Sequence, residues 1–170
     1  MFRCPFFLGL IALALSPSAS AENLEINGEI ITSTCAVKTT GGAVTVPMGK
    51  VDLAAINQAE RAGQKNFTIT LDCTGSGSAQ TVGIRFGGMP DGGTGNLALT
   101  GSTATNVGVA LYDANGIHQK IGDDPSTASL VTIPASGSED LRFSAWYASP
   151  GNNATAGTAN ATADFVVIYK

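Results

Sequence analysis

Charged residues are scarce in this chain of 170 residues, and histidine and cysteine are scarcer still. Charged side chains make up 13% of the sequence, where about 25% is typical of soluble domains. The chain has one His, three Cys and a formal charge of -4. This inventory leaves little material for a catalytic or metal site, and a nucleic-acid partner would demand a basic face. We therefore expect no enzyme, no metal, no cofactor and no nucleic-acid partner.

No apolar run is long enough to span a bilayer, which takes roughly 20 residues. The first run, residues 6–15, follows Arg3 and precedes an A-x-A pattern that ends at Ala21. A basic start, a short apolar segment and small residues at the end are typical of a secretory signal peptide. We predict that residues 1–21 form such a leader and that the rest is exported. Cleavage after Ser20 also fits the small-residue rule and stays open.

The predicted leader contains one cysteine, so the exported chain keeps two, Cys35 and Cys73. Exported chains meet an oxidising compartment, where such a pair forms a disulfide. Closing this loop would stabilise the fold by roughly 3 to 4 kcal/mol on the chain-entropy argument. We predict the Cys35–Cys73 bond, and two buried free thiols remain the less favoured alternative.

Apolar and polar residues alternate along short runs that are separated by clusters of Gly, Pro, Asn and Asp. This pattern is typical of strands in an all-β sandwich or barrel. Residues 113–116 (DANG) tolerate the positive φ angles of a tight hairpin turn. Near 53–61 the apolar stripe is narrow, so only a turn or two of helix is expected. Strands are predicted at 24–30, 43–47, 67–73, 81–86, 107–112, 117–120, 129–133, 140–148 and 161–169.

Both ends of the exported chain resemble strands, and neither carries a polar tail. Near the N-terminal end, Leu24, Ile26, Gly28 and Ile30 alternate with polar residues and therefore share one face. At the other end, the sequence of 165–170 (FVVIYK) predicts a strand that runs to the last residue. Taken alone, this pattern fits ordinary edge or closing strands of a complete sandwich equally well.

Residues with catalytic or ligating potential are isolated from one another. His118 has no second His or free Cys with which to form a metal site or a catalytic triad. Asp91, Asp123 and Asp124 lie in loops that lack the ligand spacing of a calcium loop. The Gly-rich segment 92–96 lacks the Lys and Ser or Thr that end a phosphate-binding loop. We interpret these residues as structural.

Several segments resemble those of pilus subunits assembled by the chaperone–usher route, close to the type 1 fimbrial major subunit. They are 28–31 (GEII) before 35–37 (CAV), 67–73 (FTITLDC), 107–113 (VGVALYD) and 143–147 (FSAWY). The most specific similarity is at the C-terminus, where Tyr169 is penultimate and Gly157 stands fourteenth from the end. The resemblance covers the whole exported chain.

This resemblance implies an incomplete immunoglobulin-like β-sandwich that lacks its last strand. The pilin domain would comprise residues 35–170, and residues 22–34 would form a donor-strand extension that completes a neighbouring subunit. Leu24, Ile26, Gly28 and Ile30 would be its inserted residues, with Gly28 over a shallow part of the acceptor groove. The C-terminal residues expected at the groove and at a bound chaperone are Gly157, Phe165, Val167, Tyr169 and Lys170.

The resemblance also implies three partners: other pilin subunits in a head-to-tail polymer, a periplasmic chaperone and an outer-membrane usher. The protein would pass through the periplasm to a cell-surface fimbrium that mediates adhesion. The short segment before Cys35 leaves a shaft or an adaptor position open. A secreted, self-complete β-sandwich of the carbohydrate-binding type is the alternative, although the exported chain offers few aromatic residues for it.

Overall fold

The structure, a computed structural model, describes residues 35–39 and 43–170. The predicted leader and the extension with Leu24, Ile26, Gly28 and Ile30 lie outside the described residues. Seven strands and two short helices form in the described part, where no helix is long and apolar enough to cross a membrane. In chain order they are β1 (Ala36–Lys38), α1 (Leu53–Ala59), β2 (Arg61–Asp72), β3 (Gln80–Gly87), β4 (Gly108–Asp113), η2 (Thr127–Ser129), β5 (Val131–Ile133), β6 (Ser138–Ala148) and β7 (Asp164–Tyr169).

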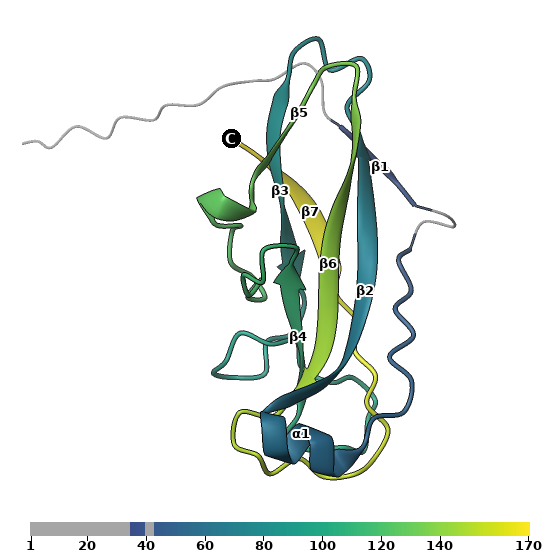
Figure 1. The fold of residues 1–170 in the computed structure, drawn as a ribbon, viewed down its shortest axis with the longest axis vertical. Coiled ribbons are helices and arrows are strands. Elements are labelled where there is room, and N and C mark those ends of the chain that lie inside the picture. The colour runs from purple at the N-terminus through teal and green to yellow at the C-terminus, as the bar shows by residue number, and fades with distance from the viewer. Residues whose placement is uncertain (1–34, 40–42) are drawn as a thin grey trace, which may run out of the picture. The chain divides into compact units, whose positions relative to one another are not determined.

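The strands form two antiparallel sheets that face each other (Figure 1). The first sheet has the order β1-β2-β6-β4, and the second has the order β5-β3-β7. Ile84 pairs with Val167 and Phe86 with Phe165 in the register of β3 and β7. Among the described residues β7 pairs with β3 alone, so its other edge is free. The two sheets confirm the predicted all-β sandwich.

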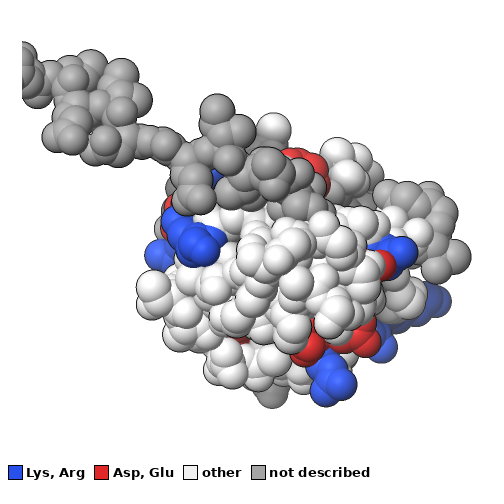
Figure 2. All heavy atoms as spheres, turned by 90° about the horizontal axis from the view of Figure 1, so that it is seen from above, with Lys and Arg blue, Asp and Glu red and all other residues white. Residues whose placement is uncertain are grey.

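The core forms where the inward faces of the two sheets meet, and the alternation along each strand selects its residues. Ile69 and Leu71 of β2 are 1% and 0% exposed. Phe86 of β3 contacts Phe143 of β6 edge-on, with ring centroids 5.1 Å apart, and so joins the sheets. Burial of each such side chain stabilises the fold by roughly 1.5 to 3 kcal/mol. Charged side chains lie toward the rim of the end-on view, whose centre is uncharged (Figure 2).

The helix α1 matches the one or two turns expected at 53–61. Its N-terminus is capped by Asp52, whose carboxylate accepts a hydrogen bond from the Ala54 amide at 3.0 Å. Ile56 is buried and anchors the helix to the core. Glu60 adopts a left-handed φ of 59° and ends the helix. Because the helix ends at Glu60, β2 begins at Arg61, well before the strand start predicted at 67.

The tight turn predicted at 113–116 is present. The Asp113 side chain accepts hydrogen bonds from the amides of Asn115 at 2.9 Å and Ile117 at 2.8 Å. Gly116 adopts a φ of 74°, a conformation that side chains with a Cβ disfavour. The residue types of the turn therefore account for its geometry.

Two predicted strands do not form. The chain at 117–120 makes only one isolated bridge, between His118 and Tyr112. Residues 43–47 alternate between exposed and half-buried positions but belong to no strand. Both predictions were wrong because alternation identifies a face, whereas a strand also needs a continuous ladder with a partner; 117–120 bonds to β4 only next to the turn, where the Gln119 amide donates to the Leu111 carbonyl at 2.8 Å.

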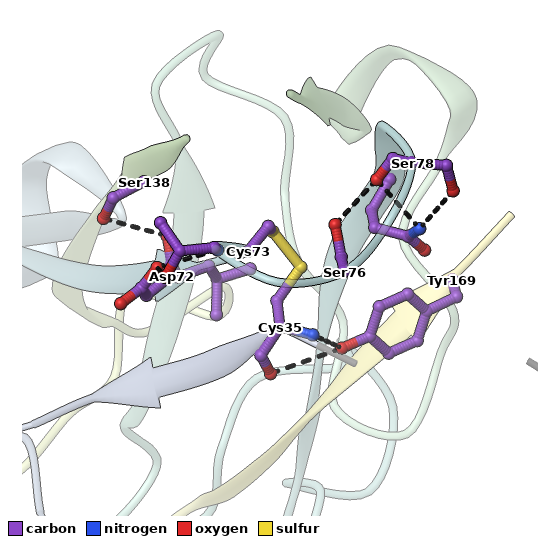
Figure 3. The surroundings of a disulfide bond; sticks show 10 residues. Cys35, Asp72, Cys73, Ser76, Ser78, Ser138 and Tyr169 are labelled. Carbon is purple, nitrogen blue, oxygen red and sulfur yellow. Dashed lines mark hydrogen bonds between the residues drawn. A yellow bond between two sulfur atoms is a disulfide. The ribbon is translucent and has the colours of Figure 1, made fainter. Parts of the chain in front are cut away.

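Cys35 and Cys73 form the predicted disulfide, with Cα atoms 4.1 Å apart (Figure 3). The bond joins the residue before β1 to the residue after β2, and the two cysteines are 6% and 1% exposed. β1 has 3 residues and pairs with the end of β2, where Ala36 lies opposite Asp72. So short a strand has few ladder hydrogen bonds, and the covalent bond therefore matters for its position.

The carboxylate of Asp72, next to the disulfide, is contacted both by Thr74, which follows β2, and by Lys38 of β1. The carboxylate accepts hydrogen bonds from the Thr74 hydroxyl at 2.5 Å and the Thr74 amide at 2.9 Å. The Lys38 ammonium of β1 lies 3.0 Å away. These contacts, with the Thr74 hydrogen bonds foremost, lower the pKa of Asp72 from 3.8 to about 2. The carboxylate thus links the end of β2 to β1.

Acid should destabilise the fold through Asp72. The pKa of Asp72 is lower in the folded than in the unfolded chain, so its contribution is present above pH 3.8 and is lost as the pH falls toward about 2. We expect the free energy of unfolding of Asp72→Asn to vary less with pH across this window than that of the unaltered chain. Urea unfolding at a series of pH values measures both slopes. Thr74→Val should weaken the same dependence, and equal slopes in all three proteins would contradict the assignment.

Candidate functional site

An open groove runs beside the start of β7, and its volume is about 890 Å³. Residues 43–49 form one wall and residues 159–165 form the other. The floor is apolar and comes from both sheets; its residues include Phe67, Ile69, Phe86, Leu97, Val109, Leu111, Ala145 and Tyr147. Most of these floor side chains are less than 8% exposed, and a concave site with an apolar floor and polar groups at its walls is typical of a binding site.

β7 carries the predicted groove residues Phe165, Val167 and Tyr169, which alternate onto one face. All three are half-buried, whereas Val82 and Ile84 of the neighbouring β3 are 0% and 2% exposed. The difference follows from position, because β3 has a strand on each side and β7 has one described neighbour. A further strand along β7 would cover the side chains that are now half-buried.

Tyr169, at the end of β7 that lies next to the disulfide, contacts Cys35 (Figure 3). Its hydroxyl accepts a hydrogen bond from the Cys35 amide at 2.8 Å and donates one to the Cys35 carbonyl at 3.4 Å. The side chain therefore bridges from β7 to the residue before β1. Cys35 is thus held both by the disulfide and by the Tyr169 hydroxyl. Of the predicted groove residues Phe165 lines the groove itself, whereas Gly157, Val167, Tyr169 and Lys170 lie outside its lining.

Lys170 extends the pairing of β7 with β3. Its amide donates a hydrogen bond to the Thr81 carbonyl at 2.9 Å. Its ammonium lies 3.7 Å from the carboxylate of Asp124, which the Arg85 guanidinium approaches to 3.3 Å. Because these side chains are about half exposed, each ion pair is worth at most about 1 kcal/mol. The backbone hydrogen bond is thus the firmer of the two restraints on this residue.

Gly157 lies toward the opposite end of the groove, where its loop packs against the main chain at 103–104. A Cβ at this position would lie 2.6 Å from the carbonyl carbon of Thr103 and closer still to the Ala104 amide nitrogen. Hydrogen bonds cross the same contact: the Thr103 amide donates to the Thr158 hydroxyl at 3.0 Å, and the Thr158 amide donates to the Thr103 hydroxyl at 2.9 Å. Only glycine permits this close approach.

Two side chains fix the loop before β7 to the sandwich. The Asn57 amide group in α1 donates to the Ala154 carbonyl at 3.2 Å and accepts from the Ala154 amide at 2.9 Å. The Tyr147 hydroxyl donates to the Ala159 carbonyl at 2.8 Å. Burial raises the pKa of Tyr147, which favours the protonated hydroxyl that donates this bond. These contacts place the groove wall beside α1.

The isolated polar candidates do not line the groove. His118 stacks on Tyr112 with ring centroids 5.1 Å apart, and burial, followed by the charge of Lys120, lowers the pKa of His118. Asp91 accepts hydrogen bonds from the amide and the hydroxyl of Thr94 and so shapes its loop. No group of three potential metal ligands occurs in the part of the chain that the structure describes.

Neither the groove wall at 43–49 nor the hydrogen bonds by which Asn57 and Tyr147 hold the loop before β7 were predicted from the sequence. The alternation of Val44, Val46 and Met48 signalled a buried face but was assigned to a strand. Asn57 and Ala154 lie 97 residues apart, and no local pattern connects them. The C-terminal residues were found only through their resemblance to a family.

Comparisons with known proteins place this geometry in context. A family model described as "Fimbrial protein" matches residues 24–170. A type-1 fimbrial protein subunit of Serratia marcescens is 35% identical over 175 residues, covering 96% of this chain and 97% of that relative. The type-1 fimbrial protein A chain of Escherichia coli K12 is 32% identical over 165 residues, covering 94% of this chain and 89% of that relative.

Two solved structures share the fold. The P pilus rod subunit PapA superimposes with a TM-score of 0.63 at 19% identity, covering 80% of this chain and 99% of that chain. The type I fimbria protein BPSL1626 of Burkholderia pseudomallei superimposes with a TM-score of 0.54 at 28% identity, covering 82% of this chain and 92% of that chain.

The fold and the groove define a pilin-type β-sandwich, the architecture that the resemblance implied. The chain belongs to the fimbrial protein family. It is a structural pilus subunit of the chaperone–usher type.

Gly157→Ala should destabilise the domain by about 1 to 3 kcal/mol, because the added methyl group would force the main chain at 103–104 to move. Urea unfolding of the exported chain measures the effect. Gly93→Ala is the matched control, since a Cβ at Gly93 meets nothing within 4 Å and should change stability little. Equal stabilities of the two variants would contradict the close contact at Gly157.

Proposed function

We propose that copies of this chain polymerise by donor-strand exchange, with residues 22–34 of one copy in the groove of the next. The observation that carries the proposal is the open groove, with its apolar floor, beside the free edge of β7. An added strand would pair with that edge and cover Phe165 and Val167, which are half-buried. Strand addition of this kind combines backbone hydrogen bonds with pockets for alternate side chains.

The length and pattern of the extension fit this site. An extended strand from Leu24 to Ile30 spans roughly 20 Å at about 3.3 Å per residue. β7 has 6 residues and spans a similar length. Leu24, Ile26 and Ile30 would each contribute roughly 1.5 to 3 kcal/mol on burial, and each ladder hydrogen bond roughly 1 kcal/mol. Before the entropy cost of ordering the extension, that total rivals the stability of a typical domain.

The contact between Tyr169 and Cys35 predicts the direction of the donor. Hydrogen bonds between Tyr169 and Cys35 join β7 to the residue before β1 at the disulfide end, so we expect the donor to enter from the end beside α1. The extension leaves its own domain at Cys35, and its last residues would therefore lie at the α1 end of the acceptor. β7 runs from the α1 end toward the disulfide, which makes the incoming strand antiparallel to it.

Gly28→Leu should block fibre formation, because in the proposed donor strand Gly28 would face the groove on the same side as Leu24, Ile26 and Ile30, where a larger side chain would clash. Asn27→Leu is the matched control, since residue 27 faces the other way in an extended strand. Fibre yield by electron microscopy and heat-resistant ladders on gels measure assembly. Normal fibres from Gly28→Leu, or fibres from a chain that lacks residues 22–31, would contradict the donor strand.

A free groove must be covered before assembly, because unpaired backbone and exposed apolar surface promote aggregation. A periplasmic chaperone would lend a strand along Phe165, Val167 and Tyr169 and would hold the C-terminal carboxylate of Lys170. An outer-membrane usher would then exchange that strand for the next donor. The route would lead through the periplasm to a surface fibre that mediates adhesion, without a catalytic role for the subunit.

Tyr169→Phe should lower the periplasmic level of the subunit. The variant keeps the ring but loses both hydrogen bonds to Cys35, each worth roughly 1 kcal/mol. Tyr112→Phe is the control, because the Tyr112 hydroxyl bonds to no other described residue. Immunoblots of periplasmic extracts with the chaperone co-expressed measure the levels. A residue appended after Lys170 should act in the same direction, and unchanged levels in both altered proteins would count against chaperone capture.

A further inference from the structure

Arg61 lies with two aromatic rings on the outer face of the first sheet. The strand pairing places Arg61 of β2 opposite Ala148 and places Trp146 of β6 opposite Ala110. The guanidinium carbon of Arg61 lies 4.7 Å from the ring centroid of Tyr112 and 4.9 Å from that of Trp146. On β4 and β6 the residues of opposite parity, Leu111, Ala145 and Tyr147, line the groove, so Tyr112, Trp146 and the guanidinium that contacts them face away from it.

The Arg61 guanidinium is held by its contacts with the rings, and its N–H groups are left without acceptors. No ion pair or hydrogen bond joins the Arg61 guanidinium to another residue in 35–39 or 43–170, although the side chain is exposed. Contacts with Tyr112 and Trp146 hold the planar group in place. A guanidinium with free, coplanar donors matches a carboxylate in a bidentate pair. His118 stacks on Tyr112 and extends the row of rings.

We propose that Arg61, with Tyr112 and Trp146, binds a carboxylate on the adjacent copy of this chain in the fibre. The inference rests on the proposed donor-strand polymer, and it adds a second contact between subunits. The contact would be head-to-tail, because the site and its partner lie at opposite ends of the same sheet face.

The acidic residue that would pair with Arg61 lies at the disulfide end of the first sheet. β2 has 12 residues and is roughly 36 Å long at about 3.3 Å per residue, so Arg61 and Asp72 mark its two ends. Near the Asp72 end, β6 carries the exposed residues Glu139 and Asp140. Asp140 shares the outer face, accepts a hydrogen bond from the Thr70 hydroxyl at 2.6 Å and has no ion pair among the described residues. It is the carboxylate that we assign to Arg61 of the next copy.

The proposed entry of the donor would bring the α1 end of one copy next to the disulfide end of the adjacent copy. The extension leaves at the disulfide end and would enter the next groove beside α1. Arg61 directly follows that helix and its C-cap residue, so it lies at the junction. The charges are complementary there, and the low overall charge of the chain leaves few competing pairs.

Fibres grown from Arg61→Ala subunits should dissociate about threefold to tenfold faster in mild denaturant than unaltered fibres, the range expected for an exposed ion pair supported by cation–π contacts. Asp140→Asn should have the same effect, and the double variant should be no worse than either single one. The difference should shrink at high salt. Arg142→Ala, an exposed arginine of the same sheet, is the control and should leave dissociation unchanged.

Donor-strand binding is measured separately, with a synthetic peptide of residues 22–34 added to each subunit. If all variants bind the peptide equally, the faster dissociation of their fibres comes from the lost Arg61–Asp140 contact and not from weaker donor-strand binding. If the unaltered subunit does not bind the peptide, the donor-strand proposal fails instead. Additive effects of Arg61→Ala and Asp140→Asn, or fibres unaffected by either, would overturn the contact. A third outcome combines two measurements: glucuronic acid shifts NMR signals of the unaltered subunit but not of Arg61→Ala, and fibres of Arg61→Ala are as stable as unaltered fibres. That outcome would assign the site to an acidic sugar and overturn the proposal.

Discussion

The unpaired edge of β7 is the constraint on which the rest of the described structure depends. An edge with free amides and carbonyls beside apolar side chains invites pairing with another strand. Phe165 and Val167 lie along that edge and are half-buried, while the adjoining groove of about 890 Å³ is open. Within the described residues no segment covers them. A strand supplied from outside would satisfy both the backbone and the side chains.

A sandwich with an open groove needs its walls held by other means, and contacts at both ends of the sandwich supply them. The disulfide and the Tyr169 hydroxyl act on the Cys35 end. At the other end Gly157 packs against the main chain at 103–104, and Asn57 clamps Ala154 to α1. Such preorganised walls confine the entropy cost of binding mainly to the incoming strand.

The two-residue period of a strand gives the first sheet two different surfaces. Leu111 and Ala145 face the groove, whereas Tyr112 and Trp146, each one residue further along, face outward to Arg61. One surface suits an apolar strand, and the other suits a carboxylate. A single pair of strands can therefore serve two contacts between subunits without conflict, because the contacts use opposite faces of the sheet.

Local signals in the sequence determined the sandwich class, the turn at 113–116 and the pairing of two exported cysteines, because each depends on residue type and short spacing. The same alternation at 43–47 and 117–120 led to no strand, since no pattern within a run identifies its partner. Only the tertiary structure decided that 43–49 forms a groove wall and that Tyr169 meets Cys35 across 134 residues. Contacts over such separations depend on how all the elements pack together, and a local pattern does not encode that packing.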